Sequence, residues 1–213
     1  MMQENNCENK FDEAAANWDS QPERVKLAQA VAGAIAERLP LDSQQMDALE
    51  FGCGTGLVGL ELVSYLKSLT AVDTSRGMLE ELGKKVREMG LAAVSVREID
   101  LSKYNLEGKF DLIFSSMTLH HVDNIETILK QFDGHLYAGG YLAIADLDKE
   151  DGSFHPPDAP GVKHYGLERD YLRDLLTRLG FSEINFETVF QFTKEQKEKL
   201  ANYPVFLLTA RKK

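Results

Sequence analysis

The feature that most constrains the fold of this chain is a glycine-rich segment, LEFGCGTG, at residues 49–56. Three glycines, Gly52, Gly54 and Gly56, alternate along it, after a short apolar run and before a run with helical spacing. Glycine permits positive φ angles and lets a ligand approach the backbone. Exposed N–H groups at the start of a helix favour a negatively charged group. The segment therefore predicts a tight strand-to-helix turn that binds a phosphate or a carboxylate.

Strand and helix patterns alternate along the rest of the chain. Short apolar runs predict strands over Met46–Phe51, Ser68–Val72, Ala92–Ile99, Phe110–Ser115, Tyr141–Leu147, Ile184–Phe192 and Val205–Ala210. We expect Gly139 and Gly140 to turn the chain into the fifth strand. Apolar residues three and four apart predict the helices between strands, and the spacings Ser20 to Glu23 and Asp123 to Glu126 are typical of capping boxes.

This alternation predicts an α/β fold with a doubly wound, mostly parallel sheet and helices on both faces. The last two predicted strands are joined by only about a dozen residues. Such a short connection favours a hairpin, and hence an antiparallel final strand. In sheets of this kind, ligands bind beyond the carboxyl ends of the strands, near the point where the strand order reverses.

The chain has 213 residues and a formal net charge of −10. Nucleic-acid binding needs clustered basic side chains, so the acidic balance argues against a nucleic-acid partner. The longest apolar runs are far shorter than the roughly 20 residues of a membrane helix, which argues against a membrane partner. The two cysteines, Cys7 and Cys53, predict free thiols. We expect one cytoplasmic domain over residues 1–213, as a monomer or a homodimer.

Residues 148–166 break the pattern, because they contain three of the six prolines together with His155 and His164. Loops longer than about 12–15 residues are uncommon in compact domains and tend to be functional. We expect an inserted loop that lies over the substrate site. The two histidines are nine residues apart and lack the tight spacing of metal ligands, so no metal site is predicted.

Two cofactor classes compete for the glycine-rich turn. Gly54, Gly56 and Gly59 fit the dinucleotide pattern G-x-G-x-x-G, although the first glycine would then lie two residues into the loop. The alternative pattern, Glu-x-Gly-x-Gly-x-Gly, starts at Glu50 and is typical of S-adenosylmethionine enzymes. Asp73, after the second strand, can bind a ribose diol in either class. A short-chain dehydrogenase also needs a Tyr-x-x-x-Lys pair, which the sequence lacks.

A third acid, Asp100, follows the third strand, where a carboxylate can accept a hydrogen bond from an adenine amino group. With these motifs in order from about Phe11 to the C-terminus, the chain resembles the class I S-adenosylmethionine-dependent methyltransferases. The resemblance implies a seven-stranded sheet of order 3-2-1-4-5-7-6 with the last strand antiparallel. It also implies S-adenosyl-L-methionine as cofactor and S-adenosyl-L-homocysteine as product.

The resemblance also assigns residues to the cofactor. It implies that Glu50 and the glycine loop bind the methionine half, that Asp73 binds the ribose hydroxyls, and that Asp100 hydrogen-bonds to the adenine. Trp18, in an N-terminal lid and helix segment of residues 1–40, either closes over the methionine end or anchors a helix. The implied cofactor-binding residues are Trp18, Glu50, Gly52, Cys53, Gly54, Thr55, Gly56, Asp73, Thr74, Ser75, Met78, Asp100, Leu101, Ser116 and Met117.

Methyl transfer from a sulfonium is an in-line displacement, so positioning and desolvation can supply much of the rate. A general base is needed only if the nucleophile must lose a proton. Candidate side chains are His120, His121, Asp148, His155, His164 and Tyr165. An organising role competes with catalysis for the His120–His121 pair. We predict His121 and His155 as the catalytic residues.

The sequence also narrows the methyl acceptor. The stretch after the fourth strand is Ser115–Thr118 and lacks the Asp/Asn-Pro-Pro-Tyr of enzymes that methylate base amines. Two cysteines are too few for arsenic methylation, so we expect a small-molecule acceptor. Two alternatives remain: an S-adenosylmethionine-binding sensor without transferase activity, and a nicotinamide-dependent oxidoreductase.

Overall fold

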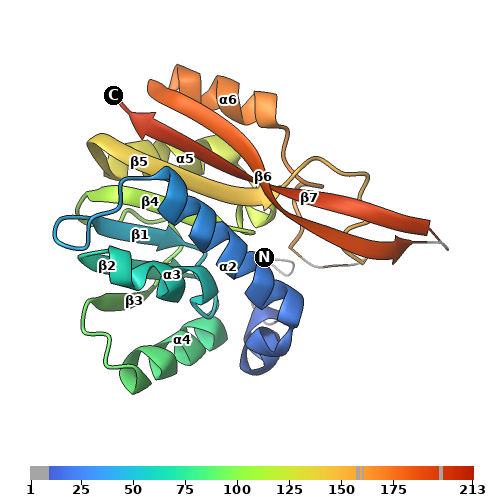
Figure 1. Cartoon of the computed structure of the whole chain (residues 1–213), viewed down its shortest axis with the longest axis horizontal. Coiled ribbons are helices and arrows are strands. Elements are labelled where there is room, and N and C mark those ends of the chain that lie inside the picture. Colours follow the sequence, from blue (N-terminus) through green and yellow to red (C-terminus); the bar gives the residue numbers. More distant parts are fainter. Residues whose placement is uncertain (1–9, 157–158, 160, 197–198) are drawn as a thin grey trace.

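The computed structural model describes residues 10–156, 159, 161–196 and 199–213, and its centre is one seven-stranded sheet (Figure 1). The strand order is β3-β2-β1-β4-β5-β7-β6, as predicted. The strands are β1 (Asp47–Phe51), β2 (Ser68–Asp73), β3 (Val94–Glu98), β4 (Phe110–Ser116), β5 (Leu136–Leu147), β6 (Phe181–Gln196) and β7 (Lys199–Lys212). Pairing is parallel from β3 to β5, and β7 is antiparallel to both of its neighbours.

Helices cover both faces of this sheet. The α-helices are α2 (Pro22–Arg38), α3 (Leu57–Leu62), α4 (Arg76–Glu88), α5 (Ile125–His135) and α6 (Arg169–Arg178). Short 3-10 helices are η1 (Ala15–Ser20), η2 (Val63–Tyr65) and η3 (Leu119–His121). Side chains that alternate along β1 and β4 explain the two layers. Ala48 and Leu112 pack in the core under α2 and α3, whereas Leu49 and Ile113 pack in the core under α5 and α6.

The predicted capping boxes are wrong in detail. Gln21 precedes α2 without a side-chain cap, and the Ser20 hydroxyl instead donates to the Asn17 carbonyl at 2.7 Å. At α5 the capping residue is Asn124, one residue after the predicted Asp123, and its side chain accepts from the N–H of Thr127 at 3.0 Å. Several polar residues precede each helix, and the tertiary path of the chain decides whether one of them caps it.

Two strand predictions at the C-terminal end of the sheet also need correction. Gly139 and Gly140 do not turn the chain into β5, because they lie inside this strand, which begins at Leu136. The residues expected to connect the last two strands instead lengthen β6 and β7, which stay paired to Gln196 and Lys199. Figure 1 shows the resulting two-stranded arm projecting beyond the rest of the sheet. The predicted antiparallel hairpin is confirmed.

The segment 148–166 forms the predicted loop, and its base is closed. Asp148 and Leu167 form an isolated bridge, and the N–H of Glu150 donates to the Tyr165 carbonyl at 3.0 Å. The arm packs against this loop, because the Lys194 ammonium donates to the Phe154 carbonyl at 2.8 Å. The loop therefore lies at the carboxyl ends of β4 and β5, where the fold predicts a substrate site.

Candidate functional site

The glycine-rich turn after β1 has the backbone that its sequence predicts. Gly52, Gly54 and Gly56 have φ angles of 67°, 52° and 80°, which favour glycine. A Cβ on Gly52 would lie 2.2 Å from the Thr118 side chain, so this glycine also lets β1 and β4 meet at their carboxyl ends. At Gly54 the nearest atom to such a Cβ is the Met78 sulfur at 4.0 Å. The open face of the turn is therefore at Gly54.

Glu50 is buried beneath this turn. Its Oε1 accepts from the Gly59 N–H at 3.2 Å, and its Oε2 is buried without a hydrogen-bond partner in the described residues. Burial raises the pKa of Glu50 to about 8 from an ordinary value of 4.5. A Cβ on Gly59 would lie 2.2 Å from Oε2. Gly59 is therefore small because the Glu50 carboxyl packs on it.

Asp73, at the end of β2, joins the turn to the start of α4. Its Oδ2 accepts from the Gly54 N–H at 2.8 Å and its Oδ1 from the Ser75 N–H at 2.9 Å. Burial raises the pKa of Asp73. A carboxylate offers about four lone-pair sites, so Asp73 keeps capacity for further hydroxyl donors. Ser75 also caps α4 by accepting from the Met78 N–H at 3.3 Å.

A surface hollow of about 530 Å³ lies beside the ends of β2 and β3. Thr74 and Asp100 are among its lining residues, so two predicted cofactor residues share one cavity. Asp100 accepts from the Ser102 hydroxyl at 2.5 Å and pairs with Lys103 at 3.1 Å. The side chain of Leu101 is fully buried in the core. Leu101 is therefore not among the residues that line the hollow.

The N-terminal segment is held against these same loops. Asp12 accepts from the Ser75 hydroxyl at 2.6 Å and from the Gly77 N–H at 2.8 Å. Asp19 accepts from the Thr55 hydroxyl at 2.6 Å and forms an ion pair with Lys85. Two aspartates therefore fasten residues 12–19 to the glycine turn and to the start of α4.

Trp18 lies in this segment, and its contacts are local. Its ring packs edge-on against Phe11, with centroids 5.8 Å apart, and the Arg24 guanidinium lies 3.6 Å from the ring centroid. These contacts favour the helix-anchoring interpretation over direct contact with a cofactor. Phe11 continues the aromatic chain to His121, at 5.4 Å between centroids.

The residues after β4 complete the rim of the site. The Ser115 hydroxyl donates to the Phe51 carbonyl at 2.8 Å, which ties β4 to β1 just before the glycine turn. Met117 has a φ of 53°, and its N–H donates to the Ala145 carbonyl at 2.8 Å.

Cys53 is a buried free thiol, and burial raises its pKa well above the ordinary value. Cys7, the other predicted free thiol, lies outside the described residues.

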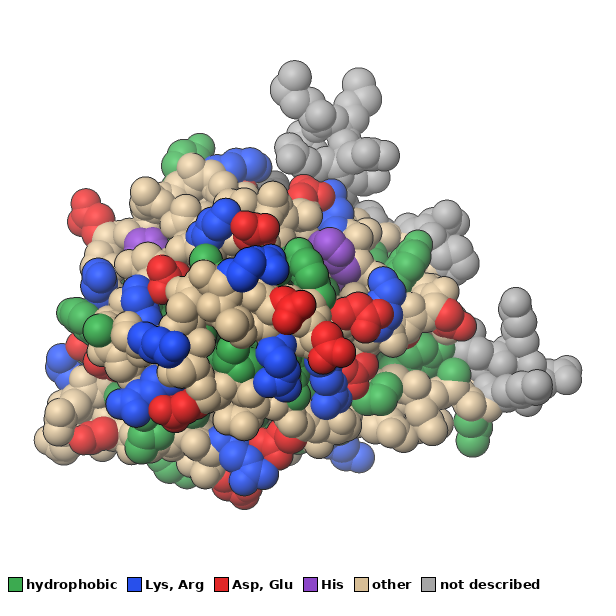
Figure 2. Space-filling model, turned by 90° about the horizontal axis from the view of Figure 1, so that it is seen from above, with side chains coloured by type: hydrophobic (Ala, Val, Ile, Leu, Met, Phe, Trp, Pro, Cys, Tyr) green, Lys and Arg blue, Asp and Glu red, His purple; other side chains and the backbone are tan. Residues whose placement is uncertain are grey.

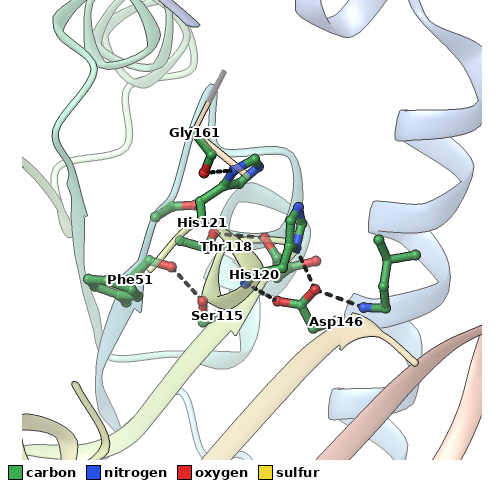
Figure 3. Close-up of polar contacts among 10 residues, drawn as sticks. Phe51, Ser115, Thr118, His120, His121, Asp146 and Gly161 are labelled. Atoms are coloured by element: carbon green, nitrogen blue, oxygen red, sulfur yellow. Dashed lines mark hydrogen bonds and ion pairs between the residues drawn. The ribbon is translucent and has the colours of Figure 1, made fainter. Parts of the chain in front are cut away.

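His120 and His121 lie together beyond the end of β4 (Figure 3), and the His155 ring lies near both of them. His120 Nδ1 lies 2.6 Å from Asp146 Oδ1, and both side chains are almost fully buried. The His121 ring lies 4.1 Å from the His120 ring, and the His155 ring lies 5.2 Å from it, between centroids. His121 Nδ1 contacts the Gly161 carbonyl at 2.8 Å.

The two predicted catalytic histidines are neutral at physiological pH. Burial lowers the pKa of His121 to about 3 and that of His155 to about 4. Burial opposes ionisation of Asp146, but the neighbouring His120 holds the pKa of this carboxyl below its ordinary value. Candidates His164 and Asp148 have structural partners: His164 Nε2 contacts the Val122 carbonyl, and Asp148 forms a bidentate pair with Arg169.

Sequence reasoning missed Asp146, Asp12 and Asp19. A signal for Asp146 exists, because it is the one charged residue in the apolar run of β5, and a buried strand keeps an acid only with a partner. The two N-terminal aspartates carry no comparable pattern. In the described part of the chain, no group of three or more His, Cys, Asp or Glu side chains is arranged to hold a metal ion. No helix there is long and apolar enough to cross a membrane.

Comparison with known proteins matches the part of the chain that contains most of the site described above. Residues 49–144 match the model of the family described as "Methyltransferase domain". An uncharacterized methyltransferase of Schizosaccharomyces pombe is 30% identical over 135 residues, which cover 57% of this chain and 48% of that protein. A malonyl-acyl-carrier-protein O-methyltransferase of Priestia megaterium is 33% identical over 105 residues, which cover 48% of this chain and 37% of that protein. The chain thus spans less than half the length of these relatives.

Solved structures show the same fold at low sequence identity. The DhpI complex with S-adenosylhomocysteine superposes with a TM-score of 0.73 at 21% identity, over 97% of this chain and 94% of that chain. Phosphoethanolamine N-methyltransferase 2 of Haemonchus contortus, in complex with S-adenosyl-L-methionine, gives a TM-score of 0.70 at 17% identity, over 85% of this chain and 52% of that chain.

Proposed function

We propose that the chain is a class I S-adenosylmethionine-dependent methyltransferase that methylates a small-molecule acceptor, and the match of residues 49–144 to the "Methyltransferase domain" family supports this proposal. The observation that carries the proposal is the convergence of a glycine turn, Asp73 and the hollow at Asp100 on one edge of the sheet. S-adenosylmethionine supplies an electrophilic methyl group when it is bound. The residues at this edge can bind the three parts of this cofactor: its methionine half, its ribose and its adenine.

Three observations support the fit between the site and this cofactor. The turn is open at Gly54, where a charged group can approach backbone N–H groups. Asp73 keeps acceptor capacity for a ribose diol, and Asp100 borders a hollow large enough for a base. Glu50 has a buried carboxyl oxygen that no described protein group satisfies. The pattern that begins at Glu50 is therefore favoured over the dinucleotide pattern, whose third glycine, Gly59, is explained by the Glu50 carboxyl.

The small-molecule acceptor rests on the surface and on the 148–166 loop. Acidic and basic side chains are interspersed over the face shown in Figure 2, without one continuous basic area. The loop and the histidine cluster occupy the ends of β4 and β5, so an acceptor there would be enclosed by protein. A non-catalytic sensor is the second candidate, because Glu50 and the turn explain binding without explaining turnover.

Calorimetry with S-adenosylhomocysteine tests the cofactor assignment. Asp73→Ala should weaken binding by about 1–3 kcal/mol, because charge-assisted hydrogen bonds to the ribose are lost. Asp174→Ala, an exposed acid in α6, is the control and should bind as the wild type does. Equal affinity of the two variants would refute the ribose assignment. Thermal protection by NADH and not by S-adenosylhomocysteine would favour the oxidoreductase instead.

A further inference from the structure

The Asp146–His120 pair is built more firmly than a chance contact. Asp146 Oδ1 accepts from the Leu147 N–H at 2.8 Å as well as contacting His120 Nδ1, and Oδ2 accepts from the His120 N–H at 3.3 Å. An ionised carboxylate can only accept hydrogen bonds, so Nδ1 must carry a proton. In the neutral ring, this fixes Nε2 as the nitrogen with the free lone pair.

This Nε2 atom is the feature that the fold does not explain. It is buried and has no hydrogen-bond partner in the described residues, and His155 Nε2 is in the same condition (Figure 3 shows the His120 ring). Buried polar groups without a partner are rare in native proteins, and each one calls for an explanation. Two unpartnered imidazole nitrogens on neighbouring rings indicate a ligand that hydrogen-bonds between them.

The surroundings indicate what kind of ligand this is. The Phe11 ring lies 5.4 Å from His121, and the Phe154 ring lies 4.8 Å from His155, so aromatic rings wall the cluster on two sides. Thr118, two residues before His120, donates to the Gly52 carbonyl at 3.2 Å, which places the cluster next to the glycine turn. The cluster therefore adjoins the cofactor edge of the sheet and suits a flat, aromatic molecule with a hydrogen to donate.

We propose, as an extension of the proposed function, that His120 is the general base of the reaction, that Asp146 positions it, and that the acceptor is an aromatic hydroxyl compound. His120 Nε2 takes the proton as the O–H bond breaks. The oxygen forms its new bond to the methyl carbon while the carbon–sulfur bond breaks, and sulfur keeps that electron pair. Asp146 balances the positive charge of the ring until the proton passes to water.

A purely structural role is the competing explanation, since a buried Asp–His pair can simply join β5 to η3. Nitrogen NMR of the histidine side chains separates the two roles without any acceptor. We expect the His120 signal, identified by its loss in His120→Gln, to show the proton on Nδ1 and none on Nε2. A proton on Nε2, in either the other tautomer or the charged ring, would overturn the proposal.

Turnover provides the second test, with release of S-adenosylhomocysteine as the readout. The probes are catechol and 4-hydroxybenzoate as aromatic hydroxyls, ethanolamine, 2-mercaptoethanol, and dimethyl sulfide, which has no proton to lose. We expect release with an aromatic hydroxyl, and a decrease of about 100-fold or more in kcat for His120→Gln. His135→Gln is the matched control, because His135 is a buried histidine that contacts the Gly108 carbonyl outside the cluster. Release from neither aromatic hydroxyl would overturn the proposal.

Asp146→Asn tests positioning. Asparagine keeps an oxygen for the Leu147 N–H and for His120 Nδ1 but removes the charge, so kcat should fall with KM nearly unchanged. The acid limb of the pH–rate profile should also move to lower pH, since the ring proton loses its neighbouring charge; His121, His155 and, through His155, Lys194 are the other titratable groups near this ring. An unmoved profile would assign Asp146 a structural role only. Failure of the proposed function is distinct, because it would appear as lost S-adenosylhomocysteine binding in the wild type.

Discussion

The buried carboxyl of Glu50 predicts a pH dependence of stability that a single substitution can isolate. In the folded chain burial raises the pKa of Glu50 to about 8, whereas the ordinary value is 4.5. Between these two values the folded state holds a proton that the unfolded state has released. Stability therefore decreases as the pH rises through this window, and the loss is complete above pH 8.

The magnitude follows from the width of the window. Each pH unit inside it costs about 1.4 kcal/mol, so the wild type should lose about 2 kcal/mol from this group between pH 6 and pH 7.5. Glu50→Gln cannot titrate and keeps the shape of the protonated acid. The free energy of unfolding of Glu50→Gln, minus that of the wild type, should thus rise by about 2 kcal/mol over this interval.

Urea unfolding, followed by circular dichroism at four pH values without cofactor, measures this difference. Subtraction removes the contributions of the histidines, which titrate in both proteins. Glu61→Gln is the matched control, because Glu61 is an exposed glutamate in α3, the helix that packs on Glu50 through Gly59. A difference for Glu50→Gln that stays flat with pH, as expected for Glu61→Gln, would mean that Glu50 is ionised in the folded chain and would refute the reasoning.

Three further predictions concern other parts of the site. Gly52→Ala should destabilise the chain by about 1–3 kcal/mol, because alanine is strained at the φ of 67° and its Cβ would meet the Thr118 side chain. Gly134→Ala lies in a helix with open space around the new Cβ, and should be neutral or stabilising in the same urea assay. Asp12→Ala should increase the S-adenosylhomocysteine dissociation rate several-fold in stopped-flow measurements, and an unchanged rate would show that the N-terminal segment does not cover the site. His155 is neutral in the folded chain, with a pKa of about 4, so the unfolded state takes up a proton first and stability falls as the pH drops from about 6.5 towards 4. His155→Gln should flatten part of that decrease, and an unaltered slope would indicate that the ring is charged.

The features of this protein that the sequence predicts are those that depend on residues close together in the chain. Positive φ angles at Gly52, Gly54 and Gly56 are local properties of a turn, and alternate glycines indicate them directly. Asp73 is the last residue of its strand, so the strand pattern places it at the carboxyl edge of the sheet. The strand order was also predicted, but only through the resemblance to a family.

The parts that were not predictable depend on contacts between distant segments. Asp146 and His120 lie 26 positions apart, and only the pairing of β4 with β5 brings them to 2.6 Å. His120 and His121 look alike in the sequence, and only the Asp146 carboxylate, which contacts His120, distinguishes them. The long β6–β7 arm was missed for a related reason: the polar residues near its tip lack the apolar alternation of a half-buried strand, and cross-strand pairing alone makes them extended.

By itself, the sequence determined the alternation of strands and helices, the positive φ angles of the glycine turn, and the acids that end or follow β2 and β3. These features are encoded within a few residues, where backbone sterics and strand periodicity operate. The tertiary structure alone decided that Glu50 lies beneath Gly59 and that Asp12 fastens the N-terminal segment. It also decided that Asp146 contacts one nitrogen of His120 and that the other has no partner among the described residues. The physical reason is that burial and charge pairing, which set how these groups ionise, exist only once remote segments have packed together.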